Sequence, residues 1–161
     1  MGVKYMKNKP FKTWHLVLLL AVVGFSIVYK IYRIFFWPNI QIKIADQELR
    51  VLVADTQERK IKGLGGRKSF GKYGGMIFPF SAPDKHGIVM RDMKFPIDIF
   101  WIANGKVVDI APNVQPEHGK SEAELMVYWP RVSSTLVLEM PAGAMRKNGF
   151  KIGDIFKNLE Y

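Results

Sequence analysis

The most hydrophobic run in the chain, TWHLVLLLAVVGFSIVYKIYRIFFW, limits the possible folds more than any other feature. Between Trp14 and Tyr29 the only residue that can carry a charge is a histidine. As a helix rising about 1.5 Å per residue, this run approaches the roughly 30 Å of a bilayer's hydrocarbon core. Lys30 can extend its charged end outward, and the helix should end before Pro38, because proline disfavours helical geometry in the preceding residue. We therefore predict one transmembrane helix that contacts the lipid bilayer through residues 14–37.

The positive charge of the chain is concentrated around this run. The whole sequence has a net charge of +10. Six basic residues and no acidic residue precede Asn39, whereas residues 39–161 carry 18 basic and 14 acidic residues. Four lysines before the run and two basic residues after it favour an N-terminus inside the cell. We predict a single-pass protein of the cell membrane, with a cytoplasmic lysine-rich tail and anchor over residues 1–38 and an extracytoplasmic domain over residues 39–161. The modest charge of that domain does not indicate nucleic-acid binding.

A cleaved signal peptide and a buried soluble helix are the alternatives to an anchor. Gly24 and Ser26 would supply the small residues before a cleavage site. Cleavage there would leave IVYKIYRIFFW as an exposed apolar terminus, which soluble proteins avoid, so the uncleaved anchor is favoured. The chain has no cysteine, which excludes disulfides and thiolate ligands but does not identify the compartment.

Beyond the run, short segments indicate a mainly β domain. IQIKI and ELRVLVA alternate apolar and polar residues and are joined through Asp46-Gln47. Asp55 followed by Glu58 is a capping-box pattern for a short helix that ends near Gly63. GMIFPF, TLVLEM and the end of KIGDIFKNL predict further strands, and AGAMRKNGF predicts a short helical turn. We predict a single sandwich- or barrel-like domain with one or two short helices.

The clearest local signal is the pair Asn104-Gly105 between the apolar runs IDIFWIA and KVVDIA, which predicts a two-residue hairpin. In the register that follows, Phe100 lies opposite Asp109. Asp98 and Asp109 then become diagonal neighbours on one face of the hairpin. Two carboxylates in such positions repel each other unless they are solvated, protonated or matched by a cation.

Several motifs in order resemble domain-of-unknown-function family 192, a group of bacterial and archaeal proteins that often carry an N-terminal signal or anchor. The motifs are VADTQERKIKGLGGRKSF, GGMIFPF, VMRDMKFPIDIFWIANGKVVDI, VLEMPAG and GDIF. The resemblance spans roughly residues 40–160 and implies a β-sandwich-like domain without an established activity. The chain departs from the family in having Met90-Arg91-Asp92-Met93 in place of Met-Lys-Asn-Thr, and Gly65-Gly66 where a bulky apolar residue commonly precedes the arginine. The family-typical positions are Gly63, Leu64, Arg67, Gly75, Met76, Phe78, Met90, Pro96, Asp98, Glu139, Ala142, Gly143, Gly153 and Asp154.

Charged residues on or beside the predicted core strands form the candidate ligand-binding site. An arginine fork suits carboxylates, phosphates and sugar acids, and a neighbouring acid can orient it or accept a ligand hydroxyl. The structural alternative is that these charges cap turns or pair with one another. In particular, Asp98 can accept backbone N–H groups of a turn. The candidate residues are Arg67, Met90, Arg91, Asp98 and Glu139.

Two other function classes remain open. A metal-assisted hydrolase would use Asp109, Glu117 and His118, although no recognised metal-ligand spacing is present. A structural partner for another envelope protein is the third class. We favour a non-catalytic binding or accessory module for an anionic or carbohydrate-like ligand, and we predict no catalytic residue, no metal and no cofactor.

Overall fold

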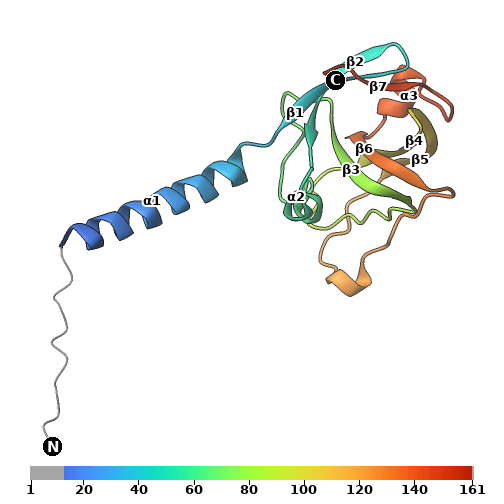
Figure 1. The fold of residues 1–161 in the computed structure, drawn as a ribbon. Helices are drawn as coiled ribbons and strands as arrows, with labels where there is room; N and C mark the ends of the chain where they lie inside the picture. Colours follow the sequence, from blue (N-terminus) through green and yellow to red (C-terminus); the bar gives the residue numbers. More distant parts are fainter. Residues whose placement is uncertain (1–12, 161) are drawn as a thin grey trace, which may run out of the picture. The chain divides into compact units, whose positions relative to one another are not determined.

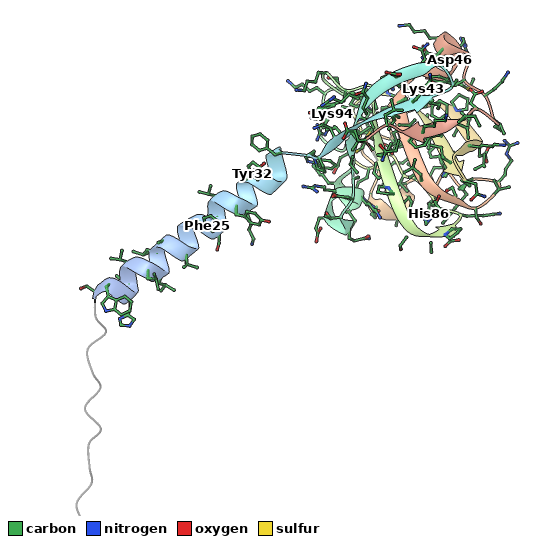
Figure 2. All side chains as sticks on the ribbon, turned by 45° about the horizontal axis from the view of Figure 1, so that its top comes forward. Phe25, Tyr32, Lys43, Asp46, His86 and Lys94 are labelled. Atoms are coloured by element: carbon green, nitrogen blue, oxygen red, sulfur yellow. The ribbon has the colours of Figure 1, made fainter. Side chains whose placement is uncertain are left out.

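The computed structural model describes residues 13–160, so the predicted lysine-rich tail over residues 1–12 lies outside the described residues. The chain divides into two compact units, the first ending at Trp37 and the second beginning at Pro38. The first unit holds helix α1 (Thr13–Phe35). The stretch Thr13–Lys30 has a mean hydropathy of 1.7 and none of it is buried. Figure 2 shows Phe25 and Tyr32 on this helix, where their side chains are 73% and 55% exposed. By length and composition, α1 is able to cross a membrane, as an anchor or as a signal sequence.

The second unit is built on one curled seven-stranded sheet (Figure 1). The strand order is β5-β4-β6-β3-β2-β1-β7, in which only β2 and β3 run parallel. The two ends of the sheet meet where the N–H of Val107 donates to the carbonyl of Asp154 at 2.9 Å. The sheet is therefore a half-barrel, which confirms the predicted mainly β class. The strands are β1 (Asn39–Ile44), β2 (Gln47–Val53), β3 (Gly75–Asp84), β4 (Ile97–Ala103), β5 (Lys106–Val114), β6 (Ser134–Pro141) and β7 (Phe156–Asn158).

The concave side of the half-barrel holds the main hydrophobic core. The strands contribute side chains such as Ile77, Phe100 and Leu138, all of which are buried. Phe150, just after helix α3 (Ala144–Asn148), packs its ring edge-on against Phe100 with 5.9 Å between centroids. Each such side chain contributes about 1.5–3 kcal/mol by leaving water. The core therefore fixes which face of each strand points inward.

Helix α2 (Gln57–Lys62) begins one residue later than the sequence pattern predicts. Thr56, not Asp55, is the N-cap: its backbone is extended, and its Oγ1 accepts the N–H of Arg59 at 3.3 Å. Asp55 instead pairs with the side chain of Arg59 at 2.6 Å. The helix ends at Gly63, as expected. The short helices predicted around residues 57–62 and 144–148 are both confirmed.

The Asn104-Gly105 hairpin is present, but the register predicted for its strands is wrong. Ile102 pairs with Val107 as expected, whereas Trp101 pairs with Asp109, so Val108 is an extra residue in β5. Such a bulge moves the residues that follow it to the other face, here Asp109 to Ala111, up to a second irregularity before Val114. Asp109 therefore lies opposite Trp101, and it is not a same-face neighbour of Asp98.

Candidate functional site

The centre of the sheet places the two buried acids of β4 and β6 on opposite faces. Glu139 of β6 pairs with Met76 of β3 and with Ile99 of β4. Asp98 pairs with Met140, the residue after Glu139. Because successive residues of a strand point to opposite faces, the Asp98 and Glu139 side chains diverge. The predicted five-residue set is therefore split by the sheet.

Glu139 lies at a pocket of about 230 Å³ on the convex face, beneath α2 and residues 87–93. Most of the lining is apolar, with Met90 and Phe78 buried in its walls. Gly65 allows a close approach of two segments, since a Cβ there would lie 2.9 Å from the carbonyl oxygen of Arg91. The lining residues are Gln57, Lys60, Ile61, Lys62, Gly63, Leu64, Gly65, Phe78, Phe80, Gly87, Ile88, Val89, Met90, Arg91, Met93, Ile97 and Glu139.

The carboxyl group of Glu139 faces the pocket without a protein partner among the described residues. Its residue is only 5% exposed, and within the described residues 13–160 no hydrogen bond or ion pair reaches the side chain. Burial raises the pKa of Glu139 to about 8. The group is therefore mainly a neutral carboxylic acid at pH 7 and can both donate and accept a hydrogen bond.

Basic side chains line the same pocket. Lys60 and Lys62 of α2 contribute to it, and the ammonium group of Lys60 lies 4.5 Å from the centroid of the Phe80 ring. The other side of Phe80 is occupied by His86, whose ring stacks on it at 3.5 Å between centroids. Among the lining residues, Glu139 is the only acid. The pocket thus combines an apolar wall, a neutral acid and positive charge.

Arg91 forms part of the wall between this pocket and a second, more polar one of about 510 Å³. Its guanidinium donates to both carboxylate oxygens of Glu122, from Nε at 2.6 Å, and to the carbonyl of Ile61 at 2.9 Å. These hydrogen bonds raise the pKa of Arg91 above its ordinary value. Arg91 therefore joins α2 to the short 3₁₀ helix η1 (Glu122–Glu124), and it demonstrates the carboxylate recognition expected of an arginine fork.

Asp98 is satisfied by the backbone, as the structural alternative proposed. Its Oδ1 accepts the N–H groups of Asn113 at 2.8 Å and Gly143 at 3.2 Å, and its Oδ2 accepts that of Met145 at 2.8 Å. The carboxylate therefore joins the end of β5 to the start of α3. It lines a separate pocket that contains none of the other predicted site residues.

Arg67 does not line the Glu139 pocket either. It is half-buried, and burial lowers the pKa of its guanidinium from the ordinary value. Of the five predicted ligand-binding residues, the pocket brings together Met90, Arg91 and Glu139. Arg67 and Asp98 lie elsewhere.

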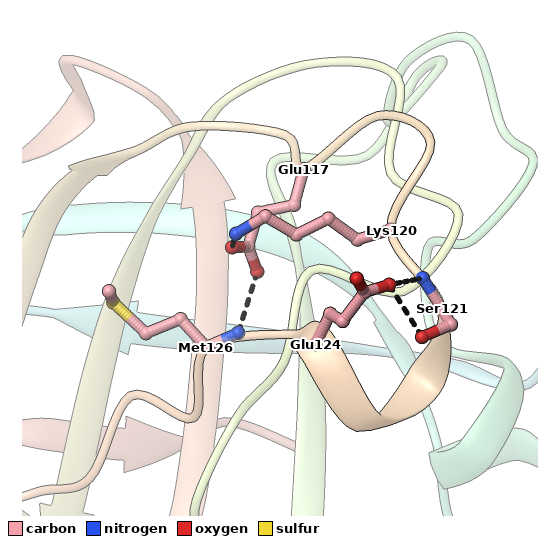
Figure 3. A network of polar contacts seen from close by, with 5 residues as sticks. All are labelled: Glu117, Lys120, Ser121, Glu124 and Met126. Carbon is pink, nitrogen blue, oxygen red and sulfur yellow. Dashed lines mark hydrogen bonds and ion pairs between the residues drawn. The ribbon is translucent and has the colours of Figure 1, made fainter.

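The residues of the alternative metal site are not assembled. Burial opposes ionisation of Asp109, but hydrogen bonds from the Arg131 side chain and backbone outweigh it and keep the pKa of Asp109 below its ordinary value. Glu117 accepts from the Lys120 side chain and from the Met126 N–H at 3.0 Å (Figure 3). His118 lines the second, more polar pocket, to which Asp109 does not contribute. Over residues 13–160, no group of three or more His, Asp or Glu side chains is arranged to hold a metal ion.

Several pocket residues were missed by the sequence reasoning. Lys60, Lys62 and Phe80 line the pocket but were not among the predicted site residues. Gly65 allows a close approach to residues 87–93, which local sequence patterns cannot indicate because the two segments are distant in the sequence.

Comparisons with known proteins agree with the fold. A crystal structure from Sinorhizobium meliloti 1021, of a protein proposed to be a transcription regulator, has a TM-score of 0.68 at 23% identity, over 76% of this chain and 95% of that chain. A protein of unknown function from Novosphingobium aromaticivorans DSM 12444 has a TM-score of 0.65 at 26% identity, over 74% of this chain and 84% of that one. No curated protein matches the sequence significantly. The model of the family DUF192, described as Uncharacterized ACR, matches residues 40–157, so the chain belongs to this family.

Proposed function

We propose that the protein is a membrane-anchored, extracytoplasmic and non-catalytic binding module that holds a small, largely apolar anion in the pocket over Glu139. The observation that carries this proposal is the buried carboxyl group of Glu139, which faces a pocket and lacks a partner in the described residues. Leaving a buried polar group unpaired costs about 1–3 kcal/mol. A ligand that supplies the missing hydrogen bond recovers this cost.

The chemistry of the lining favours an anion over the other ligand classes. Lys60 and Lys62 contribute positive charge, whereas Arg91 is paired with Glu122, and apolar side chains form most of the wall. A carbohydrate needs many polar partners, which this wall does not offer. The volume of about 230 Å³ is below the roughly 300–1,000 Å³ of drug-sized sites, which favours a small molecule.

A binding role fits the lining better than hydrolysis does. The lining residues include no serine, threonine, histidine or aspartate, so Glu139 has no nucleophile or orienting base beside it. Two-group arrangements of that kind are the usual signature of covalent or acid–base catalysis. The fold therefore provides recognition groups without a catalytic pair at this pocket.

The ligand proposal is tested by calorimetry on the full-length protein in nanodiscs of phosphatidylcholine. Hexanoate, hexyl phosphate and hexanesulfonate serve as probes. Val89→Trp fills the pocket, whereas Val132→Trp makes the same change at an exposed position that does not line it. We expect at least one anion to bind, with a loss of tenfold or more in Val89→Trp and little change in Val132→Trp. Equal effects of the two substitutions would contradict the proposal.

The membrane topology is tested by single cysteines, which the natural chain lacks. Ser133→Cys lies at an exposed position in the second unit, and Asn8→Cys precedes α1 in the sequence. A membrane-impermeant maleimide added to intact cells should label only Ser133→Cys. Labelling of Asn8→Cys alone would reverse the orientation, and release of the protein without detergent would contradict anchoring.

A further inference from the structure

The carboxyl group of Glu139 places specific demands on its ligand. A neutral carboxylic acid carries one O–H donor and retains acceptor capacity on both oxygens. The paired residues on the neighbouring strands, Met76 and Ile99, are apolar. A hydrocarbon chain reaching Glu139 would leave both its donor and its acceptors unmatched. The group of the ligand that meets Glu139 must therefore form hydrogen bonds.

A carboxylate matches Glu139 best among small groups. Two carboxyl groups in direct contact share one proton, since both do not readily ionise together. The resulting O–H···O⁻ hydrogen bond is short, at roughly 2.5–2.7 Å, and about twice as strong as a bond between neutral groups. Such a pair uses both the proton of Glu139 and the negative charge of the ligand.

The charges around the pocket decide between an anion and a cation. Helix α2 contributes Lys60 and Lys62, and residues 87–93 contribute Arg91. The lining residues of β3 and β4 are Phe78, Phe80 and Ile97, which carry no charge. Arg91 is already paired with the carboxylate of Glu122, so its charge contributes little. An ammonium ligand would pair with ionised Glu139 but would be repelled by Lys60 and Lys62. A carboxylate is attracted by them.

We infer that the ligand is a small monocarboxylic acid whose carboxylate shares the proton of the Glu139 carboxyl group, with its apolar body against the pocket wall. This inference rests on the proposed function. The proton balance is simple: neutral Glu139 and the ligand carboxylate form a pair that holds one proton and one negative charge. Where Glu139 is ionised in the free protein, binding takes up one proton from solution.

The test is calorimetry of hexanoate with the full-length protein in phosphatidylcholine nanodiscs at pH 7 and pH 9. Above a pKa of about 8, ionised Glu139 must regain its proton before hexanoate binds, so the affinity falls about tenfold for each pH unit. We expect hexanoate to bind about tenfold more weakly at pH 9 than at pH 7. Glu139→Gln keeps a neutral hydrogen-bonding group, and its affinity should change less than twofold over the same range. Titration of the lysines affects the natural protein and Glu139→Gln equally, so it does not contribute to the difference between their pH dependences.

Proton uptake provides a measurement that needs no variant. In buffers of different ionisation enthalpy, hexanoate binding to the natural protein at pH 9 should take up about 0.9 proton. Hexylammonium should bind weakly at both pH values. Hexanesulfonate, a much weaker proton acceptor, should bind at least about tenfold more weakly than hexanoate at pH 7.

The outcomes separate this inference from the proposed function. Pocket-dependent anion binding without a pH effect, or equal affinity for hexanoate and hexanesulfonate, would overturn the carboxylate inference and leave the binding module intact. Hexylammonium that binds more tightly than hexanoate and tightens from pH 7 to pH 9 would assign the pocket to cations. Binding unaffected by Val89→Trp would contradict the proposed function itself.

Discussion

Asp98 and Glu139 are two buried acids on neighbouring strands, and the fold treats them in opposite ways. Their residues are 1% and 5% exposed. Asp98 lies opposite Met140, one residue beyond Glu139, so the two side chains point to different faces of one sheet. The carboxylate of Asp98 accepts three backbone N–H groups. The Glu139 side chain accepts none within residues 13–160, and burial raises its pKa to about 8.

This difference teaches that burial alone does not distinguish a structural acid from a functional one. The N–H groups around Asp98 offset the cost of removing a charge from water, so Asp98 stabilises the junction of β5 and α3. At Glu139 no N–H group offsets the cost of burying a charge, and this cost raises the pKa of the carboxyl group. An acid that its own fold leaves unmatched, at the surface of a pocket, is the better candidate for ligand recognition.

The largest expected effect is at Asp98. Asp98→Ala leaves the N–H groups of Asn113, Gly143 and Met145 without their acceptor. Each part-buried donor that is left unmatched costs up to about 1–3 kcal/mol, so we expect the free energy of unfolding to fall by about 3–5 kcal/mol. Urea unfolding in detergent, followed by near-ultraviolet circular dichroism, measures this. A loss below 1 kcal/mol would mean that water replaces the carboxylate and that Asp98 is not structural.

The next effect is the pH dependence of stability that Glu139 causes. Its folded pKa of about 8 exceeds the ordinary value of 4.5, so the folded state binds more protons between these limits. Stability is then highest below pH 4.5 and falls as the pH rises toward 8. Between pH 5 and pH 8 the natural protein should lose about 3 kcal/mol relative to Glu139→Gln, measured by urea unfolding. If the free energy of unfolding varied with pH in the same way in the natural protein and in Glu139→Gln, Glu139 would have a hydrogen-bonding partner in the folded protein.

The sequence predicted the local elements of the fold, but not the strand pairing that places the acids on different faces of the sheet. Local patterns were sufficient for the strands, the Asn104-Gly105 turn and the two short helices, because each depends on neighbouring residues. The pairs Ala103–Lys106 and Ile102–Val107 were predicted correctly, but the pairing beyond them was wrong, because Val108 forms a bulge that no local pattern marks. One inserted residue reverses the face of the side chains that follow it, here Asp109 to Ala111. For that reason the predicted Asp98 and Asp109 pair does not exist.

The candidate site was predicted in part for the same reason. Met90, Arg91 and Glu139 do share a pocket, whereas Arg67 and Asp98 do not line it. Charge and burial could be anticipated from the apolar runs around these residues. Which face each acid occupies depends on strand order, and β6 lies between β3 and β4 and pairs with neither β5 nor β7. That arrangement follows from long-range packing.

Gly65 lines the same pocket as Glu139, and the N–H of Gly143 donates to Asp98. Gly65→Ala places a Cβ 2.9 Å from the carbonyl oxygen of Arg91, and Gly143→Ala forces alanine to a φ of 86° beside Asp98. Each should lower the free energy of unfolding by about 1–2 kcal/mol, the first through crowding and the second through backbone strain. Only Gly65→Ala should weaken hexanoate binding, measured by calorimetry. An equal loss of binding in both variants would indicate that the pocket depends on global stability.

The smallest expected effect has the opposite sign and comes from Glu139→Met at pH 4. At this pH the Glu139 carboxyl group is mostly neutral in both the folded and the unfolded chain, so the linkage to pH is small. What remains is the cost of a neutral polar group without a partner, and methionine removes that group at similar volume. Urea unfolding should show a gain of up to about 1 kcal/mol. The same polar-to-apolar change at Asp98, Asp98→Leu, should instead destabilise, because it leaves three N–H groups unmatched. If Glu139→Met destabilises by several kcal/mol at pH 4, Glu139 has a structural partner, and the distinction between the two acids fails.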